Sequence, residues 1–174
     1  KTLIWCIINM IKFFTEMNFV ILVADIGNTN ITLGVYRNNK PVCISRLATQ
    51  RHRTSEQYAI ELDAIFKLEG LDNAFSGAII SSVVPELTRA FKDAIKKVTG
   101  CDALIVAAGI KTGLKIATDN PKEVGADLVA GAVGALVQYP LPCLVMDLGT
   151  ATKLCIINSE GVFCGCTIAP GIGI

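Results

Sequence analysis

The pattern of apolar and polar positions predicts a β-sheet at the start of the fold. After residue 18, three runs of apolar and β-branched residues are separated by short polar turns, and they cover 19–25, 31–36 and 42–47. Strands of this length joined by such turns are typical of an antiparallel meander. We therefore expect three neighbouring strands in this part of the chain.

Helical patterns follow the meander and alternate with further strands. Thr54-Ser55-Glu56-Gln57 is a capping-box sequence and begins the first helix. Pro85 is suited to the first turn of the second helix, and Gly100 ends it. The expected elements are a helix over 55–69, a strand over 77–83, a helix over 85–99 and a strand over 103–107. The order β-β-β-α-β-α-β predicts an α/β fold, a ribonuclease-H-like lobe.

The second half of the chain repeats part of this pattern. A weak strand over 114–117 precedes residues 121–138, which we expect to form one helix rich in glycine and alanine. Glycine within a helix costs roughly 1 kcal/mol relative to alanine, so several of them indicate the close approach of another backbone or a ligand. A second meander then begins and is cut short at residue 174. We expect residues 1–18 to be an extension outside the fold, 19–118 a complete lobe and 119–174 an incomplete second lobe, so that the chain is a fragment.

Each meander has an Asp-x-Gly turn between its first two strands. The first turn reads Asp25-Ile26-Gly27-Asn28-Thr29-Asn30 and the second Asp147-Leu148-Gly149-Thr150-Ala151-Thr152. Glycine lets a backbone approach a ligand, successive N–H groups form an anion-binding nest, and the carboxylate can hold a cation that offsets phosphate charge. One copy alone is equally typical of a plain hairpin turn. Two copies predict related lobes whose turns hold one polyphosphate from both sides of a cleft.

Composition narrows the class of partner. The 174 residues are 52% hydrophobic and 18% charged, with a formal net charge of +1. Basic residues gather only between Arg46 and Arg53, so we expect no nucleic acid partner. The seven cysteines lack the spacing of a metal site. Buried thiols in a reducing cytosol are the preferred interpretation, with a metal site as the alternative.

The first 14 residues are apolar without forming a complete targeting segment. Asn9 and Lys12 interrupt the run, which is shorter than the roughly 20 residues that span a bilayer, and no small-residue cleavage site follows. We interpret Met17 as the true start and residues 1–16 as upstream translation; a membrane anchor is the alternative. We expect no membrane partner and a cytoplasmic location.

Five motifs resemble, in order, those of the type III pantothenate kinase family, within the actin/hexokinase/Hsp70-like ATPase superfamily. They are the two Asp-x-Gly turns, Ser81-Ser82-Val83-Val84-Pro85, Asn120-Pro121 with Val124-Gly125-Ala126-Asp127, and Ile168-Ala169-Pro170-Gly171. The resemblance implies an actin-like ATPase fold and ATP-dependent phosphorylation of pantothenate to 4'-phosphopantothenate, the first step of coenzyme A biosynthesis. It also implies Mg²⁺, a monovalent cation (K⁺ or NH₄⁺) and a homodimer.

The resemblance further implies roles for single residues. Asp127 would be the general base, Asp147 would help hold the K⁺, and Asp25 would be a second metal-binding carboxylate. Thr150 would contact the nucleotide. The other expected ATP contacts are Asp25, Ile26, Gly27, Asn28, Thr29, Asn30, Ile31 and Thr32, and the expected pantothenate contacts are Thr118, Gly125, Ala126, Asp127 and Leu128.

Three positions depart from the family pattern. Leu128 stands where the family has Arg, and a lost charged hydrogen bond costs on the order of 1.5–3 kcal/mol, so we expect weaker pantothenate binding. Thr118 replaces a Tyr, and Lys153 replaces the last Thr of the second turn motif, where it would meet a phosphate or face water. We expect an ATP-dependent pantothenate kinase. The alternatives are a non-catalytic ATP-binding paralogue with a regulatory or accessory role, and another enzyme on the same scaffold, such as a sugar kinase or a phosphatase.

Overall fold

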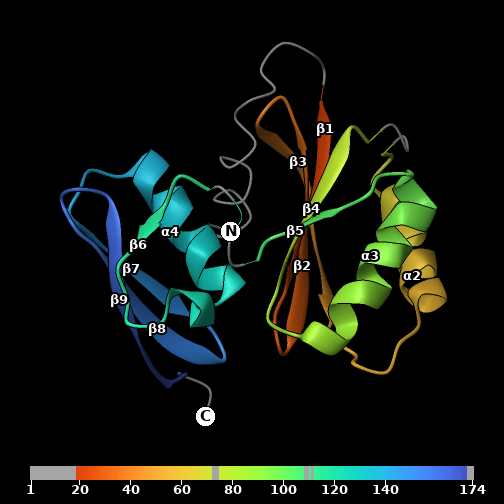
Figure 1. Cartoon of the computed structure of the whole chain (residues 1–174). Coiled ribbons are helices and arrows are strands. Elements are labelled where there is room, and N and C mark those ends of the chain that lie inside the picture. The colour runs from red at the N-terminus through yellow and green to blue at the C-terminus, as the bar shows by residue number, and fades with distance from the viewer. Residues whose placement is uncertain (1–18, 72–74, 108–109, 111, 172–174) are drawn as a thin grey trace. The chain divides into compact units, whose positions relative to one another are not determined.

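The computed structural model describes residues 19–71, 75–107, 110 and 112–171 (Figure 1). The chain divides into two compact units, of which the first ends at Val106 and the second contains the described residues from Ala107 onward. We expected the boundary after residue 118, and β6 (Lys115–Ile116) in fact pairs with a strand of the second unit. The expected N-terminal extension lies outside the described residues.

The first unit is built on a five-stranded sheet in the order β3-β2-β1-β4-β5. Its first three strands are the predicted antiparallel meander, and β4 and β5 extend the sheet in parallel. Asn38 and Asn39 have positive φ angles of 50° and 62°, which suits the tight turn between β2 and β3. The strands are β1 (Val20–Ile26), β2 (Asn30–Arg37), β3 (Lys40–Ala48), β4 (Gly77–Ser82) and β5 (Leu104–Ile105).

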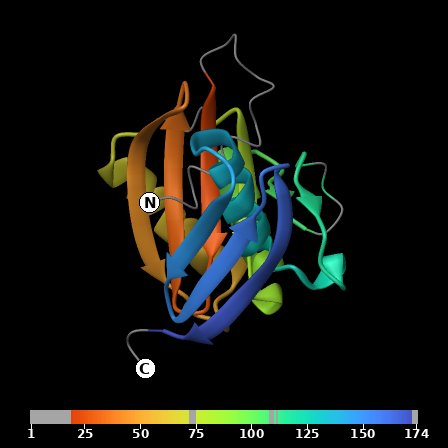
Figure 2. The same ribbon diagram turned by 90° about the vertical axis from the view of Figure 1, so that its left-hand side faces the viewer.

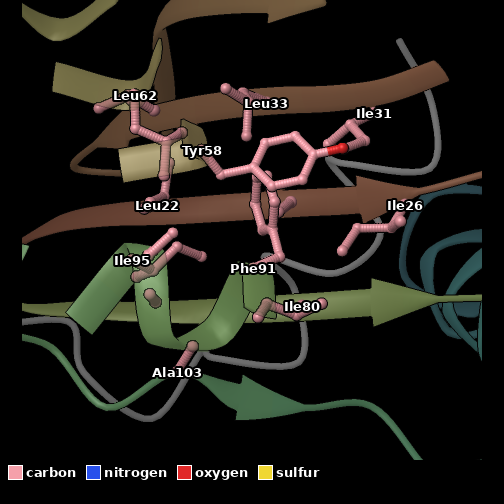
Figure 3. Packing of buried hydrophobic residues seen from close by; sticks show 14 of the residues in the cluster. Leu22, Ile26, Ile31, Leu33, Tyr58, Leu62, Ile80, Phe91, Ile95 and Ala103 are labelled. Atoms are coloured by element: carbon pink, nitrogen blue, oxygen red, sulfur yellow. The ribbon is translucent and has the colours of Figure 1, made fainter. Parts of the chain in front are cut away.

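Helices α2 (Ser55–Leu68) and α3 (Pro85–Thr99) cover one face of this sheet (Figure 1). The predicted capping box begins α2, and Gly100 ends α3 in the left-handed conformation at φ 73°. Tyr58 of α2 and Phe91 of α3 meet edge to face, with ring centroids 5.1 Å apart, above the apolar side chains of the sheet (Figure 3). This topology confirms the predicted ribonuclease-H-like fold of the first lobe.

The second unit has a four-stranded sheet in the order β6-β9-β8-β7 and one long helix, α4 (Ala126–Gln138). The remaining strands are β7 (Cys143–Leu148), β8 (Ala151–Ile157) and β9 (Val162–Pro170), which are the second predicted meander. The prediction of one helix over 121–138 is wrong at its start. Pro121–Glu123 form a 3₁₀ turn, and Val124 and Gly125 are extended, with ψ angles of 116° and 149°. Gly125 is therefore the residue that precedes α4, not part of its interior.

Helix α4 covers one face of the second sheet, and apolar side chains are exposed on the other face. Residues of α4 pack on one face, around Ala132, Cys155 and Phe163. Figure 2 looks onto the other face of this sheet. Cys143 and Val145 pack on the cluster under α4, so alternation along β7 directs Leu144, Met146 and Leu148 to the other face, and Ile156 lies opposite Leu144 on β8. These four side chains are 59%, 57%, 57% and 53% exposed.

The six described cysteines are free thiols. Cys155 and Cys166 are cross-strand neighbours whose Sγ atoms are 2.8 Å apart, and burial together with this contact raises the pKa of the Cys155 thiol. A thiol held neutral in this way suits packing, since metal binding requires the thiolate. Of the other described cysteines, Cys43 is also buried and Cys164 is exposed. None of the described helices is long and apolar enough to cross a membrane.

Candidate active site

The first Asp-x-Gly turn is closed by its own backbone and supported by the segment after β3. Gly27 N–H donates to the Asn30 carbonyl at 3.0 Å. Thr49 supports the turn twice, because its hydroxyl donates to the Gly27 carbonyl at 2.7 Å and its N–H to the Thr29 carbonyl at 2.9 Å. A Cβ at Gly27 would lie 3.1 Å from the Asn30 oxygen, so the closeness of the turn favours glycine.

Arg51 lies beside this turn, and sequence reasoning missed it. Its Nη2 donates to Asn28 Oδ1 at 2.9 Å and its Nη1 pairs with Glu86 Oε1 at 3.0 Å. The sequence shows a basic cluster at this point, between Arg46 and Arg53, but does not indicate which of its residues meets the turn. The structure thus places a guanidinium group against Asn28 of the turn.

Asp25 lies on the face of the first sheet opposite helices α2 and α3. Its neighbours Ala24 and Ile26 belong to the core beneath the helices, so alternation directs Asp25 to the other face. Thr32 pairs with Asp25 on β2, and Ser81 lies beside it on β4. Ser81 Oγ is buried without a hydrogen-bond partner among the described residues. A buried hydroxyl of this kind suits a polar ligand or a water molecule.

Asp127 is the second residue of α4, where a carboxylate is favoured by the helix dipole. It is 9% exposed. Its Oδ1 accepts from the Leu128 N–H at 2.9 Å. A Cβ at Gly125 would lie 2.6 Å from this same Oδ1, so the carboxylate occupies space that glycine leaves open. One oxygen of Asp127 is thereby fixed and the other, Oδ2, is directed at β8.

Lys153 of β8 connects Asp127 with Asp147. Its ammonium group forms a salt bridge with Asp127 Oδ2, and it lies 3.2 Å from Asp147 Oδ2. Partial burial alone would lower the pKa of Lys153, but the hydrogen bonds and charges of the two carboxylates outweigh it, so that the pKa is raised. The Lys153 side chain is 22% exposed and contacts two carboxylates, so it does not simply face water, and a phosphate contact stays a prediction. The sequence did contain a signal for the contact with Asp147, because a two-residue turn between the strands places Lys153 opposite Asp147.

The second Asp-x-Gly turn packs against the end of β9. Gly149 N–H donates to the Ala151 carbonyl at 3.1 Å, and Thr150 is exposed at the tip of the turn. A Cβ at Gly171 would lie 2.4 Å from the Gly149 oxygen and 2.5 Å from the Thr150 oxygen. The Pro170-Gly171 motif thus has a structural reason, because only glycine allows the chain to pass so close to the turn.

The residues expected to contact pantothenate lie in apolar packing, at a helix start and beside a strand. Leu128 packs against the apolar cluster between α4 and the sheet, and Gly125 and Ala126 form the start of α4. Thr118 follows β6, and its Oγ1 is buried without a hydrogen-bond partner among the described residues. The leucine that replaces the family's arginine is therefore used for packing.

The expected site residues fall into two groups. The residues of the first turn, from Asp25 to Thr32, belong to the first unit, and Thr118, Asp127, Asp147, Thr150 and Lys153 belong to the second. Within the second unit, Asp127 and Asp147 meet through Lys153. That the two turns hold one ligand stays a prediction. No group of three or more His, Cys, Asp or Glu side chains in the described part of the chain is arranged to hold a metal ion.

Residues 21–174 match the family model described as type III pantothenate kinase. The chain belongs to the type III pantothenate kinase family. The type III pantothenate kinase of Halalkalibacterium halodurans is 46% identical over 156 residues, which are 89% of this chain and 61% of that protein. The chain thus spans about three fifths of the length of this curated relative.

Solved structures resemble the chain at the level of the fold. The PilM-PilN type IV pilus biogenesis complex contains a chain with a TM-score of 0.53 and 13% identity, over 76% of this chain and 50% of that one. A Bacteroides thetaiotaomicron protein with an actin-like ATPase fold matches with a TM-score of 0.42 and 11% identity, over 57% of this chain and 37% of that one. The family assignment and the topology of the first sheet agree with the predicted actin-like ATPase fold.

Proposed function

We propose that this chain is the part of an ATP-dependent pantothenate kinase that contains the general base and both phosphate-binding turns. Membership of the family supports the reaction class. The observation that carries the proposal is the position of Asp127, a largely buried carboxylate at a helix start with a defined orientation. Phosphoryl transfer depends chiefly on positioning and on charge compensation, and this site supplies a fixed proton acceptor.

In the proposed reaction, Asp127 accepts the proton of the primary hydroxyl of pantothenate as that oxygen attacks the γ-phosphate of ATP. The Gly27 turn, supported by Thr49, and the exposed Thr150 bind the nucleotide phosphates. Arg51 lies beside the first turn and adds positive charge there. Thr118, with its unsatisfied buried hydroxyl, offers a polar contact to the pantothenate.

Asp25 suits Mg²⁺, because this ion is held in kinases by one or two carboxylates together with substrate phosphates. The buried Ser81 hydroxyl beside Asp25 offers another oxygen on the same face. Mg²⁺ would neutralise charge on the phosphates. The second expected ion, K⁺ at Asp147, does not fit the residues present, since the Lys153 ammonium lies against that carboxylate. We assign no step to a monovalent cation. A homodimer and a cytoplasmic location are also proposed from family membership.

The test is the production of ADP by the full chain, followed with and without pantothenate in the presence of Mg²⁺. The proposal expects ATP turnover that depends on pantothenate. Nucleotide binding without turnover, not restored by Leu128→Arg, would instead identify the non-catalytic paralogue. Turnover that is independent of pantothenate would identify another enzyme on the same scaffold.

A further inference from the structure

The second unit has an acidic pair with a cation supplied by the chain itself. Asp127 comes from the start of α4 and Asp147 from the end of β7, and both direct Oδ2 at the ammonium of Lys153. We infer that Lys153 is a built-in counter-ion that takes the place of an exchangeable monovalent cation and positions Asp127. The positioning of Asp127 as a base rests on the proposed function. The role of Lys153 as a counter-ion does not depend on that function.

A cation between the two carboxylates offsets their mutual repulsion, and the more buried of the two is Asp127, since the Asp147 side chain is 48% exposed. Two carboxylates that converge on one point repel each other, and partial burial weakens the screening by water. The side chain of Asp127 is 11% exposed and that of Lys153 is 22% exposed, so this ammonium is held largely away from solvent. An inorganic cation at the same point would have to displace it.

The chain contains its own comparison for this position. In the first hairpin, the residue opposite Asp25 is Thr32, whereas in the second hairpin the residue opposite Asp147 is Lys153. Both hairpins carry the same Asp-x-Gly turn, so the turn itself does not require a lysine. What the second hairpin has in addition is a second carboxylate, Asp127, which forms a salt bridge with its lysine. The lysine therefore belongs to the acidic pair.

The lysine also completes the fixation of Asp127. The Leu128 N–H holds Oδ1 at 2.9 Å, and Lys153 holds Oδ2. Lys153 is thus a positioning residue for the proposed base, since its ammonium group contacts the Asp127 carboxylate.

The experiment measures the thermal unfolding midpoint of the full chain in KCl, NH₄Cl, NaCl and choline chloride at equal ionic strength, without nucleotide or pantothenate. For the wild type we expect the same midpoint in all four salts, because the site already holds its cation. Lys153→Thr, which installs the residue of the first hairpin, and the uncharged Lys153→Met should unfold about 5 °C lower in choline and recover part of this loss in K⁺ or NH₄⁺. Lys122→Met, at an exposed lysine of the same unit, is the matched control and should show neither effect.

A wild-type midpoint that rises in K⁺ relative to choline would overturn the inference, and so would Lys153 variants that respond to no cation. The wild-type measurement is decisive even if the variants do not fold. Because no nucleotide is present, failure of this test is separate from failure of the proposed kinase reaction. Where the chain turns over ATP, the wild type should be equally active in K⁺ and choline, and Lys153→Thr should need K⁺ or NH₄⁺.

Discussion

Gly125 limits where the carboxylate of Asp127 can lie. The residue precedes α4, and a methyl group placed on it would come within 2.6 Å of Asp127 Oδ1. The contact atom is the end of a side chain, so the backbone can remain in place while the carboxylate moves. A substitution at Gly125 can therefore change the orientation of the Asp127 carboxylate while leaving the stability of the fold nearly unchanged.

Gly125→Ala should lower the rate of pantothenate phosphorylation by about 10²-fold, the scale of loss that follows a displacement of about 1 Å in a catalytic group. The unfolding midpoint should change little. Steady-state kinetics together with thermal unfolding checks this. Gly77→Ala is the control, because its new methyl group would meet only Ile21 Cδ1, at 3.5 Å. A Gly125→Ala protein with wild-type kinetics would contradict this account of Asp127.

At the scale of single elements, the boundaries of α2 are set by side chains that the sequence identifies. Thr54 Oγ1 accepts from Gln57 N–H at 3.3 Å, and Thr54 N–H donates to Gln57 Oε1 at 2.9 Å. These bonds satisfy donors that the first helical turn otherwise leaves without partners. Tyr58, which follows directly, is fully buried in the core.

Thr54→Ala should destabilise the first unit by about 1 kcal/mol, because one half of the capping box is removed. Urea unfolding followed by circular dichroism measures this loss. Gln57→Glu keeps an acceptor for the Thr54 N–H and should stay close to the wild type. Equal stability of Thr54→Ala and the wild type would show that packing of Tyr58 alone fixes the helix start.

The sequence predicted the strands and both helices of the first unit because turn residues and caps bound each apolar run. It did not predict the start of α4, since Val124 and Gly125 continue a small-residue pattern that is equally compatible with a helix. The salt bridges of Lys153 were also missed. They depend on the register of the β7–β8 hairpin and on the placement of α4 over it, both of which are set by packing at a distance. Asp127 and Asp147 were selected through the family motifs, and their meeting at Lys153 is a result of the structure.

At the scale of the whole molecule, the second sheet has an exposed apolar face. Leu144, Met146, Leu148 and Ile156 form a neighbouring set on β7 and β8. Contiguous exposed apolar surface on a sheet promotes association between molecules. We therefore predict poor solubility for this chain, with the exposed face as the physical reason.

Residues 1–174 should therefore self-associate at micromolar concentration, and Met146→Thr combined with Ile156→Thr should reduce this association. Threonine retains the preference for a strand while removing apolar surface. Size-exclusion chromatography with light scattering provides the measurement. Val42→Thr combined with Ile44→Thr, which changes exposed residues of β3 in the other sheet, is the matched control. A monodisperse wild-type monomer would contradict the expectation.

The two units contribute different parts of the proposed reaction, the first a phosphate-binding turn with Asp25 and the second the base with its lysine. The most direct measurement is the mass-spectrometric detection of 4'-phosphopantothenate formed from ATP and pantothenate by the wild type and by Asp127→Asn, with nucleotide affinity measured in parallel. We predict that the wild type forms one phosphopantothenate per ADP and that Asp127→Asn forms it about 10²- to 10⁴-fold more slowly at unchanged nucleotide affinity. Consumption of ATP without phosphorylated pantothenate, or an Asp127→Asn protein as fast as the wild type, would contradict the account.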